Sequence, residues 1–192
     1  MSGASGIPYG MRLLECLLDA GITVYFLLSQ AAQVVAALET DLKLPGKIEN
    51  LETFLHERFQ VEPHQLKVFG QNQWTAPVAS GTGVSDAMVI CPCSSGCISA
   101  IATGASNNLL ERAADVSIKE RKPLILVHRE TPVSAIHLEN MLKLARCGVT
   151  IMPASPGFYN KPTSINDLID FMVARILDQL SIDHTLMPGW GD

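Results

Sequence analysis

The chain has 192 residues, which suffices for one well-buried domain and is short for two. Its net charge of −5 and its lack of basic runs argue against nucleic acid as a partner. Apolar residues make up 47% and charged residues only 17%. Such a chain is either an ordinary compact α/β domain or one that buries part of its apolar surface between subunits.

No apolar run reaches the roughly 18 residues that span a bilayer, and we expect no secretory signal. The five cysteines are an odd number in a chain too large to need disulfide staples, which favours a reducing compartment, the cytoplasm. Cys91, Cys93 and Cys97 form a cluster without a second ligand pair or a nearby histidine. We therefore expect buried small hydrophobic residues rather than a zinc site, and predict no metal.

The first segment in chain order is a small-residue loop, Gly3–Gly6, which leads into an apolar helical stripe from Pro8 to Gly21. The free backbone N–H groups at such a helix start form an anion site. A phosphate-binding loop normally follows a strand, and only two residues precede this one. We therefore expect a sheet in which the first, N-terminal strand is missing.

The apolar run Ile22–Leu28 predicts a strand covered on both faces, and Ser29 is expected to cap a helix from Gln30 to Glu39. The carboxylate of Glu39 opposes the dipole at that helix end, so it is either a solvated end or a site residue. A short helix is expected over 51–59 and a strand over 66–69. In the loop over 71–83, Trp74 is either a core plug or a wall of the site.

The stretch over 87–108 is the centre of the expected site. Its apolar run Ala87–Cys91 predicts a buried strand, and Pro92 is expected to stop regular pairing. Ser94, Ser95 and Gly96 then begin a helix. In open α/β sheets, turns of this kind lie at the carboxyl ends of strands, where ligands bind.

Charged residues follow in the next segments. Arg112 and Lys119 are seven residues apart and share a helix face, which could be merely solvated. A buried strand over 124–127 delivers Arg129 and Glu130 at its carboxyl end, directly after His128. Charged residues directly after a buried strand are less easily explained as ordinary solvent-exposed surface residues. A helix is expected from 131–132 through 145.

The last third of the chain adds a strand over 149–152 and a stiff loop that lifts Tyr159 out of the sheet. Ser164 and Asp167 predict a capping box for a helix through 180. Inside that helix, Arg175 either snorkels to solvent or binds a ligand. The tail over 181–192 carries Trp190, and we expect it to dock on a neighbouring subunit.

Strands alternate with helices throughout, which predicts one domain over 1–192 with a three-layer α/β/α, Rossmann-like (flavodoxin-like) fold and a mostly parallel sheet. The candidate cations and small-residue loops suit phosphate. The sequence has no P-loop, no G-x-G-x-x-G and no paired-aspartate run for magnesium. We therefore expect a site that holds phosphate without a metal.

Taken together, these segments resemble the family of UbiX-type flavin prenyltransferases (the UbiX/Pad flavoproteins), in order and over nearly the whole chain. The resemblance is specific because it rests on many motifs at once. They are Gly3–Gly6 (GASG), Cys91–Gly96 (CPCSSG), Ala105–Asp115 (ASNNLLERAAD), Lys119–Arg121 (KER), Arg129–Glu130 (RE), His137–Leu142 (HLENML) and Pro153–Tyr159 (PASPGFY). Family members have a strand before the glycine loop, and this sequence departs from them there.

The resemblance implies that reduced FMN is bound by small-residue loops and one arginine: Gly3, Ala4, Ser5, Ser29, Ser94, Ser95, Gly96, Cys97 and Arg129. It implies that the phosphate of dimethylallyl monophosphate is bound by Arg112, Lys119, Arg129, Tyr159 and Arg175. Glu130 resembles the acid/base residue beside the leaving phosphate, and Lys119, Glu39 and Tyr159 are the other residues with implied catalytic roles. Trp74 and Trp190 resemble aromatic walls near the allyl group.

These residue types suit the implied chemistry. An allylic carbon–oxygen bond ionises when fixed cations and the Tyr159 hydroxyl neutralise the departing phosphate, without magnesium. Aromatic faces stabilise the allyl cation by about 0.5–2 kcal/mol per contact. The reduced flavin is the nucleophile, and a phosphate–Glu130 pair could remove the proton that the second bond releases.

The resemblance also implies partners. The prenylated flavin serves a UbiD-type decarboxylase, in ubiquinone biosynthesis or in aromatic acid decarboxylation, and the enzyme assembles as a dodecamer. Two other functions stay open. One is a flavin-dependent decarboxylase of the phosphopantothenoylcysteine type, although its Pro-x-Met-Asn-x-x-Met-Trp run is not found. The other is a flavin-binding subunit without catalysis, which would not need Glu130 or Lys119.

Overall fold

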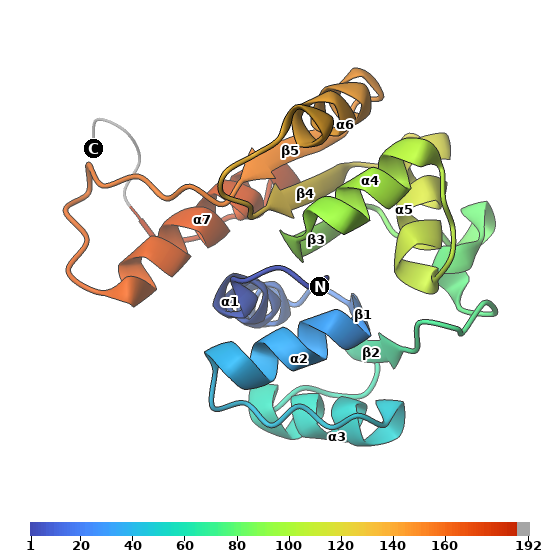
Figure 1. Cartoon of the computed structure of the whole chain (residues 1–192). Coiled ribbons are helices and arrows are strands. Elements are labelled where there is room, and N and C mark those ends of the chain that lie inside the picture. The colour runs from blue at the N-terminus through green and yellow to red at the C-terminus, as the bar shows by residue number, and fades with distance from the viewer. Residues whose placement is uncertain (188–192) are drawn as a thin grey trace.

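The computed structural model describes residues 1–187, in which helices and strands alternate along the chain (Figure 1). The strands are β1 Val24–Leu27, β2 Leu66–Phe69, β3 Met88–Cys93, β4 Leu124–His128 and β5 Thr150–Pro153. The α-helices are α1 Ile7–Asp19, α2 Gln30–Glu39, α3 Ile48–Phe59, α4 Ser95–Thr103, α5 Leu109–Lys119, α6 Ala135–Arg146 and α7 Ile165–Leu180. Two short 3-10 turns, Pro77–Ala79 and Gly81–Gly83, precede β3.

All strand pairs among the described residues are parallel, but the strands form two sheets instead of one. β1 pairs with β2, with Val24 opposite Leu66. β3, β4 and β5 form the second sheet in that order. The parallel α/β architecture is confirmed, and β1 and β3, the facing edges of the two sheets, are not paired with each other.

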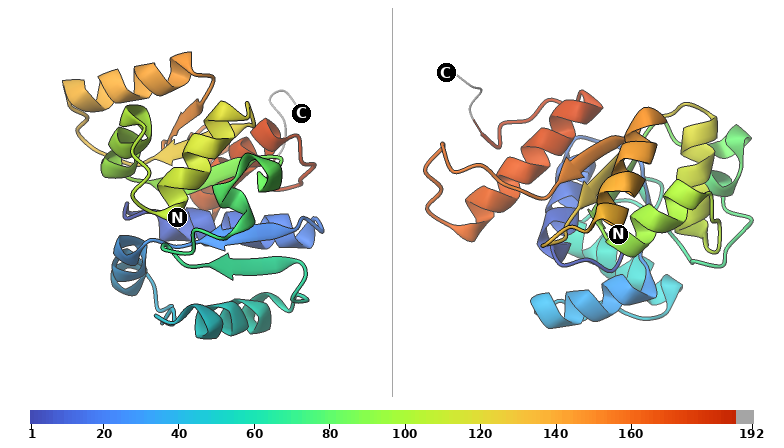
Figure 2. Two further views of the ribbon diagram at one scale, coloured as in Figure 1. Left: turned by 90° about the vertical axis from the view of Figure 1, so that its right-hand side faces the viewer. Right: turned by 45° about the horizontal axis from the view of Figure 1, so that its top comes forward.

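Helices cover both faces of the sheets and give the three expected layers (Figure 2). α1 and α7 pack together on the face of the second sheet that carries Ile125 and Val127. α4, α5 and α6 cover the opposite face, which carries Ile90 and Leu126. α1 reaches both sheets, because Leu13 belongs to the core of the second sheet, while other residues of α1 pack with β1, β2 and α3.

One glycine explains how closely α1 approaches β3. A Cβ added at Gly10 would lie 2.3 Å from the carbonyl oxygen of Cys91, so no larger residue fits without movement. Gly6 has φ +112°, a backbone conformation that favours glycine just before α1 begins. These two positions fix the loop and the first turns of α1 against β3.

Local capping signals locate the helix boundaries correctly. The Ser29 hydroxyl accepts from the Ala32 N–H (3.0 Å), so α2 begins and ends where the sequence predicts. Ser164 and Asp167 form the expected capping box at the start of α7.

Three sequence predictions are wrong in detail. β3 continues through Pro92 to Cys93, because the register with β4 shifts between Ile90 and Cys93. α6 begins at Ala135 rather than at 131–132, because Ser134 is the residue that caps it. The run over 22–28 is not covered on both faces, since Tyr25 is 39% exposed at the gap between β1 and β3.

The tail packs on its own chain as far as the structure describes it. Ile182 and Leu186 lie against the core that α7 forms with the second sheet. Trp190 lies outside the described residues, and docking on a neighbouring subunit stays a prediction. Between residues 1 and 187, no helix combines the length and the apolar character needed to cross a bilayer.

Candidate functional site

Two polar segments meet at the carboxyl ends of β3 and β4. The Ser95 hydroxyl, in the first turn of α4, donates to Glu130 Oε2 (3.0 Å) and lies 2.9 Å from His128 Nε2. A hydroxyl has one proton, and here it points to Glu130, so the contact with His128 requires a proton on Nε2. Ser95 therefore links the end of β4 to the start of α4. The sequence predicts that these two segments meet because the carboxyl ends of neighbouring parallel strands lie at the same edge of a sheet.

The surroundings of this network favour an ionised Glu130 and a neutral His128. The hydrogen bond from Ser95 lowers the pKa of Glu130, with help from the amide of Thr131 and the charge of Arg129. Burial lowers the pKa of His128, although the charge of Glu130 acts in the opposite direction. A carboxylate that is ionised at neutral pH can accept a proton, so Glu130 has the state that a general base needs.

Glu39 lies at the start of α1, where its exposed carboxylate binds backbone groups of another segment. Its carboxylate accepts from the backbone N–H of Gly6 (2.9 Å) and of Ile7 (3.1 Å). Burial raises the pKa of Glu39, but hydrogen bonds from Ser5, Gly6 and Ile7 and the charge of Arg129 outweigh it, so the pKa is lowered. The chain therefore places its own anion at the helix N-terminus that follows the glycine loop.

Met1 and Ser2 hold that loop. The Ser2 hydroxyl accepts from the N–H of Ser94 (2.8 Å), and the Ser2 N–H donates to the carbonyl oxygen of Pro92 (3.1 Å). The N–H of Ser29 donates to the carbonyl oxygen of Met1 (3.1 Å). The glycine loop, the Ser29 cap and the Ser94 cap are thus joined through two residues.

The charge of Arg129 lowers the pKa of both Glu39 and Glu130. Its Nε is buried and has no hydrogen-bond partner among residues 1–187. Its backbone N–H donates to the carbonyl oxygen of Cys93 (3.3 Å), which fixes it beside the start of α4. A buried guanidinium N–H without an acceptor is costly, so this atom indicates an anionic ligand.

The other predicted cations lie on helix faces and are paired locally. Arg112 bonds Asp115 (2.6 Å), and its Nε donates to the carbonyl oxygen of Ala79 (3.1 Å). Lys119 pairs with Glu120, the next residue along the chain. Arg175 pairs with Asp178 (2.5 Å) on α7. Among the contacts of the described residues, none of these pairs reaches Ser95, Glu130 or Glu39, so one chain does not assemble the whole predicted set.

Two of the predicted aromatic residues, Tyr159 and Trp74, lie at the surface of the chain. The ring of Tyr159 packs edge-on against Phe171 of α7, with centroids 5.6 Å apart. Arg175 is one helical turn beyond Phe171 on the same face, so Tyr159 and Arg175 line one stretch of α7. Trp74 is 48% exposed, which excludes the core-plug interpretation and keeps the wall of a site as a prediction.

All three clustered cysteines are buried; the pKa is raised for Cys91 and Cys93, whereas the hydrogen bond with Cys93 lowers the pKa of Cys97. Burial raises the pKa of Cys91 to about 12, which disfavours the thiolate that zinc requires. The Cys93 thiol is likewise buried, with a raised pKa whose first cause is a hydrogen bond with Cys97. No set of three potential metal ligands occurs within the described part of the chain.

Sequence reasoning missed two residues of this site, Ser2, which supports the glycine loop, and His137, which packs edge-on against His128 with centroids 6.3 Å apart. It placed His128 at the strand end but did not predict its contact with Ser95. The signal for His128 was its place at the end of a buried strand. Nothing in the local sequence distinguishes Ser2 or His137.

Comparisons with known proteins agree with this geometry. The family model of flavoproteins matches residues 1–177. Over its full length the chain is 57% identical to flavin prenyltransferase UbiX of Pseudomonas aeruginosa, and it covers 92% of that relative. The crystal structure of AnUbiX (PadA1) in complex with FMN and dimethylallyl pyrophosphate has a TM-score of 0.87 at 36% identity, and 99% and 94% of the two chains are covered. A dodecameric FMN-dependent UbiX-like decarboxylase of Escherichia coli O157:H7 also has a TM-score of 0.87, at 34% identity, with 100% of this chain and 97% of that chain covered.

A parallel α/β fold with an anion site at its strand ends, matched over residues 1–177, makes this chain a flavoprotein. Within the flavoproteins, the chain is similar over its full length to relatives that are named flavin prenyltransferases. The chain belongs to the UbiX family of flavin prenyltransferases, as its motifs indicate.

The residues at the strand ends fit the phosphate-bearing cofactor of this family, FMN. The unpartnered Nε of Arg129 supplies a buried cationic donor for an anionic oxygen. An added Cβ at Gly3 would lie 2.4 Å from Cβ of Ala31, so the loop packs closely on the start of α2 and no larger residue fits there without movement. Gly96 has open space at its Cα, at the first turn of α4. Small residues and exposed amides of this kind suit a phosphate and a flat ring.

Proposed function

We propose that this flavin prenyltransferase transfers a dimethylallyl group from dimethylallyl monophosphate to reduced FMN and so produces prenylated FMN. The observation that carries the proposal is the pair formed by Arg129 and Glu130 after β4. A half-buried arginine with a buried, unpartnered Nε adjoins a carboxylate whose pKa the Ser95 hydrogen bond lowers. Such a pair suits a reaction in which a phosphate leaves and a proton is taken up.

The strand-end loops are the proposed FMN-binding residues. They are Gly3, Ala4, Ser5, Ser29, Ser94, Ser95, Gly96, Cys97 and Arg129. Hydrogen bonds through Met1 and Ser2 hold three of these loops together, which supports a common ligand. When bound, reduced FMN supplies an electron-rich ring that attacks the allyl carbon.

The prenyl phosphate is proposed to meet fixed cations and a phenol. Arg129 contributes from the strand ends, while Tyr159 and Arg175 contribute from one stretch of α7. As the carbon–oxygen bond of the donor breaks, the charge that develops on the phosphate is neutralised by these groups without a metal. Glu130 then accepts the proton that the ring closure releases, and Ser95 orients it.

We propose that assembly completes the site. Arg112 and Lys119 on α5, and the walls Trp74 and Trp190, would be supplied by neighbouring copies, with the tail over 181–192 docked between subunits. The support is the apolar surface of single helices: Ile136, Leu138 and Leu142 of α6 and Val34 and Leu38 of α2 are all more than half exposed. The Escherichia coli structure is dodecameric, and we propose the same number here. Static light scattering tests it, and a monomer at working concentration would refute it.

The product is proposed to serve a UbiD-type decarboxylase, in ubiquinone biosynthesis or aromatic acid decarboxylation. Such a recipient is needed because a prenylated flavin is a cofactor, not an end product. All five cysteines are free thiols, which supports a reducing compartment, the cytoplasm.

The test is an anaerobic incubation with dithionite-reduced FMN and dimethylallyl monophosphate, followed by mass spectrometry of the released flavin. We expect a mass gain of one five-carbon unit. A parallel reaction with the diphosphate measures the preference for the donor. A tightly bound but unmodified flavin would instead support the phosphopantothenoylcysteine-type decarboxylase or the non-catalytic flavin-binding subunit.

A further inference from the structure

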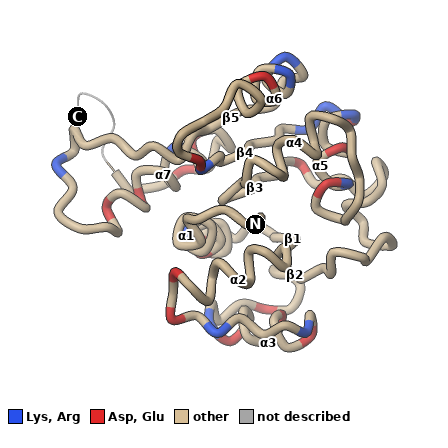
Figure 3. The backbone as a smooth tube through the Cα atoms, in the orientation of Figure 1, with Lys and Arg blue, Asp and Glu red and all other residues tan. Residues whose placement is uncertain are grey.

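His128 is a buried histidine to which the proposed mechanism gives no role. It is the last residue of β4, the central strand of its sheet, and it is 3% exposed. Within the described chain, β3, β4 and β5 carry no Lys, Arg, Asp or Glu (Figure 3). An imidazole buried in such a sheet loses its hydration, so its polar contacts must offset that loss.

Neighbouring elements hold His128 on several sides. Its backbone lies opposite Cys93 of β3 and Pro153 of β5, and its carbonyl oxygen accepts from the N–H of Ala154 (2.8 Å). On the side of α6, its ring packs edge-on against His137. A side chain on a central strand that is also packed against a second ring has few alternative rotamers. His128 is therefore a rigid group against which a smaller side chain can be oriented.

That smaller side chain is Ser95, in the first turn of α4. Its hydroxyl lies 2.9 Å from Nε2 of His128 and donates to Glu130 Oε2 (3.0 Å). A serine has three staggered rotamers, and its proton also turns about the C–O bond. Because Nε2 donates to the Ser95 oxygen, the Ser95 proton is directed to Glu130. The two hydrogen bonds form a chain in which each polarises and strengthens the other.

We propose that His128 is a positioning residue for prenyl transfer, whose Nε2–H holds the Ser95 hydroxyl in the orientation that donates to Glu130. This role rests on the proposed function, in which Glu130 accepts a proton. Burial lowers the pKa of His128, so the ring donates as a neutral group at neutral pH. Of the charged and titratable groups that face the ring, Glu130 opposes this shift, whereas His137 and Arg129 add to it.

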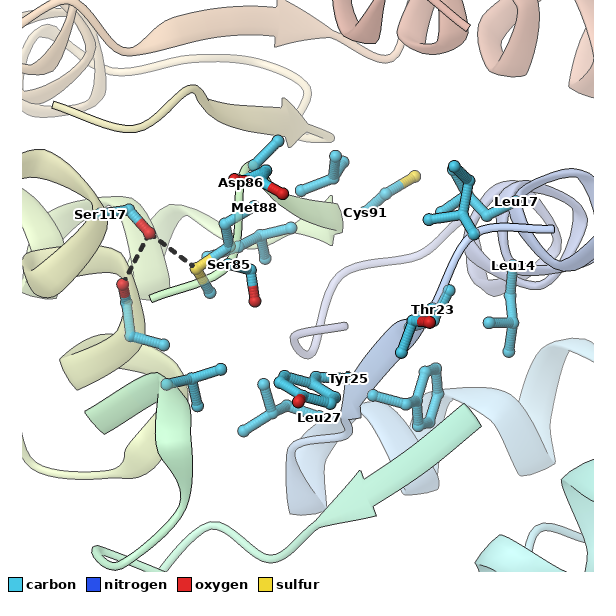
Figure 4. Close-up of a pocket in the computed structure, with 18 of the residues that line it drawn as sticks. Leu14, Leu17, Thr23, Tyr25, Leu27, Ser85, Asp86, Met88, Cys91 and Ser117 are labelled. Atoms are coloured by element: carbon cyan, nitrogen blue, oxygen red, sulfur yellow. Dashed lines mark hydrogen bonds between the residues drawn. The ribbon is translucent and has the colours of Figure 1, made fainter. Parts of the chain in front are cut away.

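Ser117 offers a helix hydroxyl without such a partner. On α5, it donates to the carbonyl oxygen of Ala113 (2.9 Å) and lies 3.7 Å from Sδ of Met88 (Figure 4). It borders the pocket between β1 and β3 and bonds within its own helix. Ser117→Ala is therefore a matched control for the removal of a hydroxyl from a helix.

The test compares two replacements of His128 in the full-length protein. Leu has no donor, whereas Gln can donate its amide N–H to Ser95 while the ionised Glu130 takes the Ser95 proton. We expect the single-turnover rate to fall by roughly three- to tenfold in His128→Leu, with FMN affinity and the Michaelis constant for dimethylallyl monophosphate unchanged. His128→Gln should recover most of the rate, and Ser117→Ala should retain it. Equal losses in the Leu and Gln variants would overturn the proposal.

A Ser95→Ala background separates positioning from a purely structural effect. In that background, His128→Leu should cause no further loss of rate, because the hydroxyl that His128 orients is absent. If His128→Leu lowers the rate by the same factor with and without the Ser95 hydroxyl, the proposal is wrong.

Infrared spectroscopy measures the same contact without flavin or turnover. The carboxyl band of Glu130 is obtained as the difference between the protein and its Glu130→Gln variant. The hydrogen bond from Ser95 lowers the pKa of Glu130, so the titration midpoint of this band should rise in His128→Leu, by no more than it rises in Ser95→Ala. An unchanged midpoint would overturn the proposal even where prenyl transfer is observed. A raised midpoint without prenyl transfer would support the contact and refute the proposed function instead.

Discussion

The charged residues of the site fall into two groups that differ in what they contact. Glu39 and Glu130 bond segments far away in sequence, the start of α1 and the start of α4. Arg112, Lys119 and Arg175 bond carboxylates one to three residues away on or at the end of their own helix. The first group is assembled by the order of parallel strands within one chain. The second group is held on outer helix faces, where assembly with further copies would bring it to the ligand.

Glu130→Gln is the strongest test of the first group. Gln keeps the shape and the hydrogen bond from Ser95 but cannot take up a proton. We expect turnover to fall by about 10²- to 10⁴-fold, measured as the single-turnover rate of flavin prenylation, while FMN titrates normally. Glu57→Gln, an exposed carboxylate of α3, is the matched control. An unchanged rate would remove Glu130 from the chemistry.

Arg129→Gln tests whether the unpartnered Nε binds the cofactor. Loss of a charge-assisted hydrogen bond worth about 1.5–3 kcal/mol predicts FMN binding weaker by roughly 10- to 100-fold. Fluorescence titration of oxidised FMN measures it without turnover. Lys43→Gln, which removes an exposed charge after α2, should leave the affinity unchanged. If both variants bind alike, the anion at Arg129 is not that of FMN.

Glu39→Gln separates the helix-capping role of this residue from catalysis. We expect a loss of about 1 kcal/mol in the free energy of unfolding at pH 7, because the charge at the start of α1 is gone. The folded-state pKa of Glu39 is lowered, so its contribution is complete above its ordinary value of 4.5 and disappears as the pH falls through the lowered value. The difference between wild type and variant in denaturant titrations should therefore shrink toward pH 3. A constant difference would exclude the charge as its cause.

Arg175→Ala gives the smallest expected effect and tests the second group. Arg175 is half exposed and already paired, so we expect the Michaelis constant for dimethylallyl monophosphate to rise a few-fold and FMN affinity to stay the same. The higher Michaelis constant should be found only in the assembled protein, which is checked by assaying separate size-exclusion fractions. Equal losses for both ligands would contradict the assignment of Arg175 to the prenyl phosphate.

Local signals predicted the fold well, and long-range contacts did not follow from them. Ser29 and Ser164 cap helices through residues three positions away, which a sequence displays directly. Glu39 finds its partners 32 and 33 residues back, through the packing of α1 and α2, so its role as a cap of α1 was invisible. The motifs identified the family, whereas the contact of Ser95 with His128 depends on how β3 and β4 align.

The hydrogen bonds of Met1 and Ser2 have a consequence for how the molecule unfolds. They join the two sheets, and Leu27 of β1 and Phe69 of β2 also pack in the hydrophobic core of the second sheet. Opening of the unit made of β1, β2 and α3 would therefore uncover part of the core of the second sheet, so we expect the two sheets to unfold together. Met1 and Ser2 thus connect the sheets at the same place where Ser2 holds the Ser94 cap of the site.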